Sequence, residues 1–331
     1  MLDLLLFNSF MGRPYGPSDV LLDNGLGLLC RAARDAGLRV ALEDPANLER
    51  FEEFSPRGLA LFADLAARLL LRSLGRGRRP RLAALPWAVA SCLQRRGVER
   101  RLRRYLEGLA RRIAAEQVAV VGVKCWLGRR FVAAEELAAL VHRLSPRTLV
   151  VAGGPQVNIF RELALEGNEF DFGIYGEGER ALVRLVLRVR QLLERGMDRA
   201  QAVEVISKEA AAGGFPNLLY RRDGRPQAAP RELLPVERDF LPLYPRLSGK
   251  AKVHVLVDAR GCCWGRCHFC VHSRIAGPYA ERSPRSVVEE MREVVRRYRI
   301  GIFRFAASSP SLEHQLAVAR AIREARLQVV Y

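Results

Sequence analysis

The sequence predicts an α/β protein in which a doubly wound, parallel-sheet unit is followed by the start of a second α/β unit. Short β-rich apolar runs alternate with amphipathic stretches through the first 195 residues, and the alternation resumes at "KVHVLVDARG". This alternation is typical of parallel strands joined by right-handed helical crossovers. A chain of 331 residues also has the usual length for about two domains.

The first unit is expected to span residues 1–195 in a Rossmann-like arrangement. Strands are expected at residues 2–8, 38–44, 118–126, 147–154 and 170–179, and helices at about 19–36, 131–144, 157–166 and 178–195. Gly37 is a typical residue to end the first helix. Residues 45–116 have helical periodicity and exceed the length of an ordinary crossover. We therefore expect an inserted helical subdomain at about 45–116.

The remaining chain divides into a linker and a second α/β unit. Residues 196–251 are rich in proline, and Asp223-Gly224 between apolar runs predicts a small β-hairpin. From 252 to 331 we expect a strand at 252–259, a cysteine-rich loop, a helix at 284–298, a strand at 301–308, a helix at 311–326 and the start of a strand at 327–331. Because so few units cannot close a barrel, we expect a partial barrel in a C-terminally truncated sequence.

Composition favours a soluble, cytoplasmic protein over a membrane or secreted one. The chain is 49% hydrophobic and 27% charged, and no run approaches the roughly 20 uncharged apolar residues of a membrane span. The N-terminus lacks the basic region and cleavage site of a secretory signal. The net charge of +18 comes almost entirely from arginine. Without a Lys-rich tail or recognition-helix signature, nucleic-acid binding is disfavoured, and no membrane partner is expected.

Four of the seven cysteines lie within the nine residues of "CCWGRCHFC". They are Cys262, Cys263, Cys267 and Cys270. The last two are spaced C-x-x-C, and either of the first two supplies a third thiolate from the same loop. Three thiolates suit an iron-sulfur cluster with one open iron, whereas a closed zinc site needs four ligands. His268 and His272 keep a zinc site as the alternative.

The cysteine loop resembles that of the radical S-adenosylmethionine (radical SAM) superfamily, which typically reads C-x-x-x-C-x-aromatic-C. Cys267, Phe269 and Cys270 match this pattern directly. The usual spacing favours Cys263 as the first ligand, while relatives with a longer spacer align Cys262. The resemblance implies a 4Fe-4S cluster whose unique iron binds S-adenosylmethionine, with Phe269 beside the cofactor. Relatives often carry an acidic residue at the end of the next strand, where this sequence offers only Ser308 and Ser309.

The first unit resembles the cobalamin-binding subfamily of radical SAM proteins. Its "AGGP" and "DFGIYGEGE" segments follow the fourth and fifth strands, and open parallel sheets bind ligands at these strand ends. The sequence has no D-x-H-x-x-G motif, so it offers no histidine as a lower cobalt ligand. The cobalamin contacts that the resemblance implies are Asn8, Ser9, Lys124, Cys125, Trp126, Gly153, Gly154, Pro155, Gly176 and Glu177.

The resemblance implies a cobalamin-dependent radical SAM enzyme, most often a methyltransferase that acts on an unactivated carbon through a 5'-deoxyadenosyl radical. A radical SAM cyclase or rearrangement enzyme would use the same parts. A zinc-stabilised, Arg-rich nucleic-acid-binding protein is the alternative from another class, and a truncated chain would bind cobalamin without catalysis. The expected partners are a small-molecule or peptide substrate and an electron donor such as flavodoxin or ferredoxin.

Overall fold

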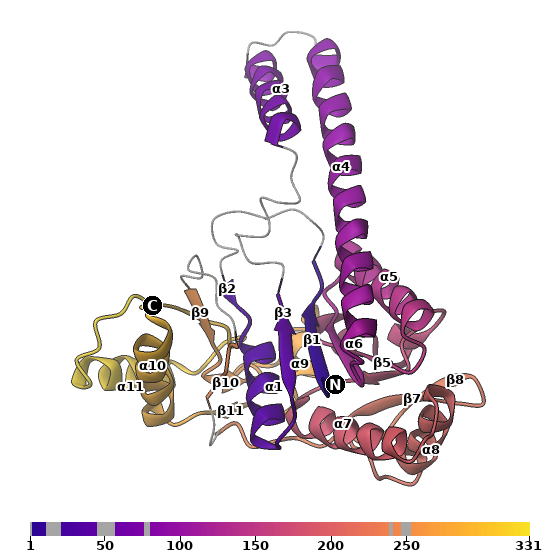
Figure 1. Ribbon diagram of the computed structural model, residues 1–331. Coiled ribbons are helices and arrows are strands. Elements are labelled where there is room, and N and C mark those ends of the chain that lie inside the picture. Colours follow the sequence, from indigo (N-terminus) through magenta and orange to yellow (C-terminus); the bar gives the residue numbers. More distant parts are fainter. Residues whose placement is uncertain (1, 11–20, 45–56, 76–79, 238–240, 246–252) are drawn as a thin grey trace.

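The computed structural model describes residues 2–10, 21–44, 57–75, 80–237, 241–245 and 253–331 (Figure 1). Several expected features fall partly outside these residues. They are the beginning of the first helix at 19–20, the first part of the insertion at 45–56, and linker residues 238–240 and 246–251. No helix among the described residues is both long enough and apolar enough to cross a membrane.

A seven-stranded sheet in the order β3-β1-β4-β5-β6-β7-β8 forms the first unit. The strands are β1 (Leu4–Asn8), β3 (Val40–Glu43), β4 (Val120–Lys124), β5 (Leu149–Gly153), β6 (Phe172–Ile174), β7 (Leu218–Arg222) and β8 (Arg225–Ala228). The five strands from β3 to β6 are parallel, whereas β7 and β8 are antiparallel. All five strands predicted for this unit are present, each shorter than expected, and the predicted α/β fold class is confirmed.

Helices cover both faces of this sheet, as a doubly wound fold requires. Leu5 and Phe7 of β1 enter one core with α5 (Arg129–Leu144), whereas Leu4 and Leu6 enter the opposite core with α1 (Asn24–Asp35). Alternate residues of a strand point to opposite faces, and both faces are buried here. The other helices of the unit are α6 (Pro155–Phe160), the 3-10 helix η2 (Arg161–Leu165), α7 (Glu179–Glu194) and α8 (Arg199–Ala211).

The segment expected to be a linker adds structure to the first sheet. The predicted hairpin is β7 and β8, and β7 pairs with β6, so sheet pairing continues to Ala228. Helix α8 was not predicted. Its Asp198 accepts a hydrogen bond from the backbone N–H of Gln201, whose side chain accepts from the backbone N–H of Asp198. This capping box stabilises the start of α8. The domain boundary at residue 195 stays a prediction.

The insertion is helical where the structure describes it. Helices α3 (Arg57–Gly75) and α4 (Pro80–Ala115) project from the sheet as two long rods (Figure 1). The C-terminal half of α4 packs on the sheet through Leu102, Leu106 and Ile113, which belong to the same core as Leu5. The insertion is therefore anchored by the end of α4.

The second unit has a three-stranded parallel sheet in the order β12-β9-β2. It consists of β9 (Val253–Leu256), β10 (Ala259–Arg260), α9 (His272–Ile275), β11 (Ala280–Glu281), α10 (Pro284–Tyr298), β12 (Ile302–Phe305) and α11 (Leu312–Glu324). Strand β2 (Leu21–Leu22) comes from the N-terminal part of the chain and was not predicted. In the segment predicted as a final strand, only Val330 forms an isolated bridge, to Ile302.

Helix α1 packs very closely on the chain that leads into the second unit. A Cβ built on Gly27 would lie 2.7 Å from Cε1 of Tyr244 and 2.9 Å from Cβ of Pro242. We expect Gly27→Ala to lower the free energy of unfolding by about 1–3 kcal/mol, because these groups must move apart. Among the described residues, no atom lies within 4 Å of a Cβ built on Gly108 in α4, so Gly108→Ala should raise the free energy of unfolding by about 0.5–1 kcal/mol. Urea denaturation of both variants measures the difference, and a Gly27→Ala protein as stable as wild type contradicts the close packing.

Candidate functional site

A cavity of about 510 Å³ lies at the C-terminal ends of the parallel strands. Val257 and Ala306 of the second unit also line it, so the cavity lies between the two units. Six of the predicted contacts line this cavity: Lys124, Gly153, Gly154, Pro155, Gly176 and Glu177. Asn24 and Asn158, which also line it, were not predicted. The cavity is where an open parallel sheet places its ligands.

Glycines keep the floor of this cavity free of side chains. Gly154 has a φ of 89°, and a Cβ there would lie 3.0 Å from Cγ of Lys124 and 3.2 Å from the carbonyl oxygen of Cys125. A Cβ on Gly122 would lie 2.9 Å from Cδ2 of Leu6. Both close approaches favour glycine. A ligand can therefore approach the backbone at the strand ends.

Lys124 is the cationic side chain of the cavity wall, and it is paired. Its Nζ forms an ion pair with Asp23, which also caps α1 by accepting a hydrogen bond from Leu26 N. The same Nζ lies 4.6 Å from the ring centre of Trp126. These contacts fix Lys124 between α1 and the loop after β4.

Four of the predicted contacts, Asn8, Ser9, Cys125 and Trp126, do not line the cavity. They lie in or against the loop that follows β4. Asn8 Oδ1 accepts a hydrogen bond from Nε1 of Trp126 at 2.8 Å, and Ser9 Oγ accepts one from the Trp126 backbone N–H at 3.3 Å. Cys125 is completely buried, and burial raises the pKa of its thiol far above the ordinary range. The role of these four residues in cofactor binding stays a prediction.

The cysteine loop begins after β10 and is fastened to the end of β12. The backbone N–H of Cys263 donates to the carbonyl of Ser309 at 2.9 Å, and Cys270 N donates to the carbonyl of Cys267 at 3.2 Å. Gly265 N donates to Sγ of Cys262 at 3.5 Å. This hydrogen bond, with one from the backbone of Trp264, lowers the pKa of the Cys262 thiol. All four cysteines of the loop are free of disulfides.

The donor chemistry of this loop fits an iron-sulfur cluster, since it offers several accessible thiols at C-x-x-C spacing. Cys263 is exposed, and the ring of Phe269 is 93% exposed. Across the described ranges, no three or more His, Cys, Asp or Glu side chains form a group that could hold a metal ion. The choice of three thiolates, and the role of Phe269 beside them, therefore stay predictions.

An acidic residue missed by sequence reasoning lies close to this loop. Asp258 follows β9 and is 2% exposed, and its Oδ2 lies 3.1 Å from Nε2 of His314 on α11. The other oxygen, Oδ1, has no hydrogen-bond partner within the part of the chain that the structure describes. At the end of the strand that follows the cysteine loop, Ser308 and Ser309 were the only polar groups expected. The run "VHVLVD", an acid directly after an apolar strand, is the signal that could have indicated Asp258.

One ion pair joins the cavity to the cysteine loop. Nη1 of Arg260 donates to Oε1 of Glu177 at 2.7 Å and to the carbonyl of Leu234 at 2.7 Å. The other oxygen of Glu177 accepts from Leu234 N at 2.7 Å. Both charged side chains are mostly buried. Glu177 lines the cavity and Arg260 lies two residues before Cys262, so the pair holds the two predicted cofactor regions together.

A second polar network connects α1 to the interior of the second unit. Glu290 on α10 accepts hydrogen bonds from Arg282 Nη1 at 2.6 Å and from Asn24 Nδ2 at 3.1 Å. Nε2 of His254 lies 2.8 Å from the same carboxylate. Glu290, Arg282 and His254 are 2%, 3% and 0% exposed. Burial acts to raise the pKa of Glu290, but the hydrogen bond from His254 and the charge of Arg282 outweigh it and hold the pKa below its ordinary value.

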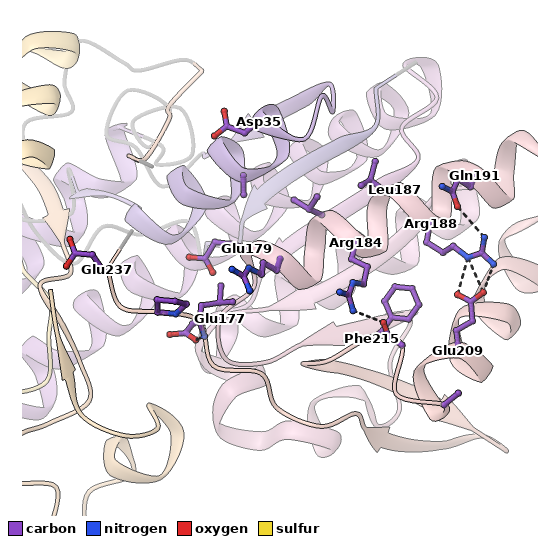
Figure 2. A pocket seen from close by; sticks show the side chains of 17 residues that line it. Asp35, Glu177, Glu179, Arg184, Leu187, Arg188, Gln191, Glu209, Phe215 and Glu237 are labelled. Atoms are coloured by element: carbon purple, nitrogen blue, oxygen red, sulfur yellow. Dashed lines mark hydrogen bonds and ion pairs between the residues drawn. The ribbon is translucent and has the colours of Figure 1, made fainter. Parts of the chain in front are cut away.

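A larger groove of about 950 Å³ follows α7 on the outside of the first unit (Figure 2). Two of its arginines have partners within the protein. Arg188 makes a two-point contact with Glu209, and Arg184 Nη1 donates to the carbonyl of Gly214 at 2.9 Å. Glu177 is the only predicted site residue in its lining, and no cysteine of the loop reaches it. The strand-end cavity therefore remains the candidate site.

Comparison with known proteins finds a family model that covers part of the first unit. Residues 87–186 match the family model described as B12 binding domain. The curated proteins that were compared include no match. Among solved structures, the radical S-adenosylmethionine methyltransferase TsrM from Kitasatospora setae, with cobalamin and a 4Fe-4S cluster bound, has a TM-score of 0.57 at 18% identity. That match covers 98% of this chain and 52% of TsrM, so this chain spans about half of TsrM.

A second solved structure also resembles this chain in fold at low sequence identity. OxsB, a cobalamin-dependent S-adenosylmethionine radical enzyme with aqua-cobalamin and S-adenosylmethionine bound, has a TM-score of 0.58 at 13% identity, covering 97% of this chain and 37% of OxsB. The chain therefore shares the fold of TsrM and OxsB. This chain combines that fold with a match to the B12 binding domain, which confirms the resemblance predicted from the sequence.

Proposed function

We propose that this chain is the cobalamin- and cluster-binding part of a cobalamin-dependent radical SAM enzyme that transfers a methyl group to an unactivated carbon. The proposal rests on two features, a cavity and a cysteine loop, that are joined at the interface between the two units. A glycine-floored cavity at the strand ends is linked by Glu177 and Arg260 to a loop of free thiols. The B12 binding domain match and the fold shared with TsrM and OxsB support it.

The residues of the chain divide into two groups by the cofactor that they would hold. Gly153, Gly154 and Gly176 would let cobalamin approach the backbone, and the thiolates of Cys267 and Cys270, with Cys263 or Cys262, would hold the cluster. When bound, these groups supply a methyl group and, with S-adenosylmethionine, a 5'-deoxyadenosyl radical.

The apolar cavity walls would serve the reaction by excluding water. Leu6 and Val151 of the first sheet and Val257 and Ala306 of the second unit line the cavity. Abstraction of hydrogen from carbon needs a site that keeps water away from the reacting atoms. The walls from the two units would meet this need together.

The reaction partners follow from the proposed chemistry. Reductive cleavage needs one electron, so a donor such as flavodoxin or ferredoxin is expected, and we place the protein in the reducing cytoplasm, where thiols are kept reduced. TsrM has been solved with a tryptophan substrate. For this chain we propose a small-molecule or peptide substrate. Cyclisation or rearrangement with the same cofactors is the second candidate reaction.

Cobalamin binding tests the cavity directly. We expect the purified chain to retain added hydroxocobalamin through gel filtration, and Gly154→Ala to weaken binding at least about tenfold, because the new Cβ meets Lys124 and Cys125. Gly167→Ala imposes the same kind of backbone strain at φ 66° but has no atom within 4 Å and lies outside the cavity lining. Absorption spectra of the eluted proteins give the bound cobalamin. The assigned cavity is contradicted if Gly154→Ala and Gly167→Ala lose bound cobalamin equally. It is also contradicted if neither the wild-type protein nor Gly167→Ala retains cobalamin.

The ion pair between the cavity and the cysteine loop gives a separate prediction. Arg260→Gln should lower the free energy of unfolding by about 1–3 kcal/mol, because it leaves the largely buried Glu177 carboxylate without its charged donor. The cysteine loop should then react faster with iodoacetamide in the cofactor-free protein. Arg180→Gln removes an exposed ion pair to Glu232 and should change neither measurement appreciably. Equal alkylation rates in all three proteins would show that the pair does not hold the loop.

A further inference from the structure

The outer part of the helical insertion has features that the proposed reaction does not use. We define the helical arm as residues 57–75 and 80–98, which comprise α3 and the N-terminal half of α4. The arm projects away from both sheets (Figure 1). Because it does not enclose the strand-end cavity, its side chains need another explanation.

One face of α3 is an exposed apolar row. Leu61, Leu65 and Leu69 are spaced four residues apart and are 74%, 56% and 53% exposed. Residues at this spacing share one face of a helix. Ala63 and Ala66, by contrast, are buried. Helix α4 adds a second exposed row with the same spacing, formed by Leu85, Val89 and Leu93.

The charges of the arm are mostly positive, because residues 57–75 and 80–98 contain six arginines and one acid, Asp64 on α3. Between Leu65 and Val98 the sequence contains eight arginines and no aspartate or glutamate. Arg68 and Arg72, on α3, are exposed and have no ion-pair partner among the described residues. At the base of α4 several arginines are paired with acids, as Arg103 is with Glu107 and Glu136. The exposed apolar rows therefore lie beside arginines whose charge is not neutralised by a described acid.

We propose that the helical arm binds the surface of an anionic phospholipid membrane, a partner that the composition of the sequence did not predict. Helix α3 would lie in the interface with the Leu61, Leu65 and Leu69 row at the acyl boundary. Arg68 and Arg72 emerge along the same face, and their long side chains would extend outward to headgroup phosphates. An exposed apolar face beside arginines is the pattern of interfacial helices, whose binding combines apolar burial with attraction to anionic lipids. A nucleic acid would satisfy the arginines but would offer no apolar phase for the leucines. A second copy would bring an arm of the same charge against the first.

Vesicle binding tests this proposal with the chain as purified. We expect co-sedimentation with vesicles of phosphatidylcholine plus phosphatidylglycerol, little binding to phosphatidylcholine alone, and weakening by added salt. Leu65→Glu with Leu69→Glu should reduce binding at least about tenfold. The matched control is Val132→Glu with Leu163→Glu, which makes the same change of charge at residues of similar exposure outside the arm and should bind like wild type.

A second variant tests the charge without placing acids on the helix. Arg68→Gln with Arg72→Gln should weaken binding to the anionic vesicles severalfold, while circular dichroism shows that all variants remain folded. The proposal is overturned if wild type ignores phosphatidylglycerol or if the Leu65→Glu, Leu69→Glu variant binds as well as the control. The proposal is also overturned if light scattering shows a dimer that the leucine substitutions abolish. A further contradicting result is binding of the arm to RNA that the leucine substitutions do not weaken. None of these results bears on cobalamin or iron binding.

Discussion

Cys267→Ala will leave the protein without iron while it still retains cobalamin. Cys267 is the middle thiol of the predicted ligand set, and its carbonyl accepts the hydrogen bond that forms the turn to Cys270. An iron-sulfur cluster with one open iron depends on three thiolates, so loss of one removes its support. The strand-end cavity contains no residue of the cysteine loop, so cobalamin binding should persist.

The measurement is iron and cobalt content after anaerobic reconstitution, with Cys92→Ala as the matched control. Cys92 lies in α4, far along the chain from the loop, and its replacement should leave iron at the wild-type level. Cys263→Ala is expected to behave like Cys267→Ala. If Cys262→Ala loses iron and Cys263→Ala keeps it, the first ligand is Cys262. Iron retained by Cys267→Ala would show that the ligand assignment is wrong.

Glu290→Gln will lower the free energy of unfolding by about 3–5 kcal/mol, because the buried Arg282 guanidinium is left without its counter-charge. The effect depends on pH. The folded pKa of Glu290 is depressed, so its contribution is fully present above the ordinary carboxyl pKa and is lost as pH falls through the folded value. The free energy of unfolding of the wild-type protein should therefore fall in acid. The Glu290→Gln variant should lack the part of this fall that comes from protonation of Glu290.

Urea denaturation at neutral and acid pH measures both parts of this prediction. Glu289→Gln, on the neighbouring position of α10, breaks an exposed pair with Arg285 and should cost no more than about 1 kcal/mol. Its stability should follow the wild-type pH dependence. If Glu290→Gln costs no more than Glu289→Gln, the network does not stabilise the second unit in the way that its burial indicates.

The sequence predicted those elements whose signal is local. Strand β1 reads "LLLFN" because both of its faces are buried, and α10 begins at Pro284 as expected, with Ser283 as its N-cap. Strand β2 escaped prediction because two residues carry no periodicity and its partner, β9, lies about 230 residues further on. The pairing of β7 with β6 was missed for the same reason, since a hairpin signal does not identify the sheet that it joins.

The candidate site also has a part that the sequence could predict and a part that it could not. The glycines at the strand ends were found because the position of ligands in open parallel sheets is a rule of topology. Asn8 and Ser9 also follow a strand, but their side chains bind Trp126, and side-chain direction cannot be read from a motif. The partnership of Glu177 with Arg260 joins residues 83 positions apart and needed the folded chain to become visible.

The most direct test of the central claim is the metal and cofactor content of the wild-type chain. The protein would be prepared without oxygen, supplied with ferrous salt, sulfide and hydroxocobalamin, and desalted before its absorption spectrum is recorded. We predict a brown protein with about four irons and four sulfides per chain, as one 4Fe-4S cluster requires, together with about one cobalt. A colourless protein that contains zinc in equal amount and neither iron nor cobalt would contradict the account.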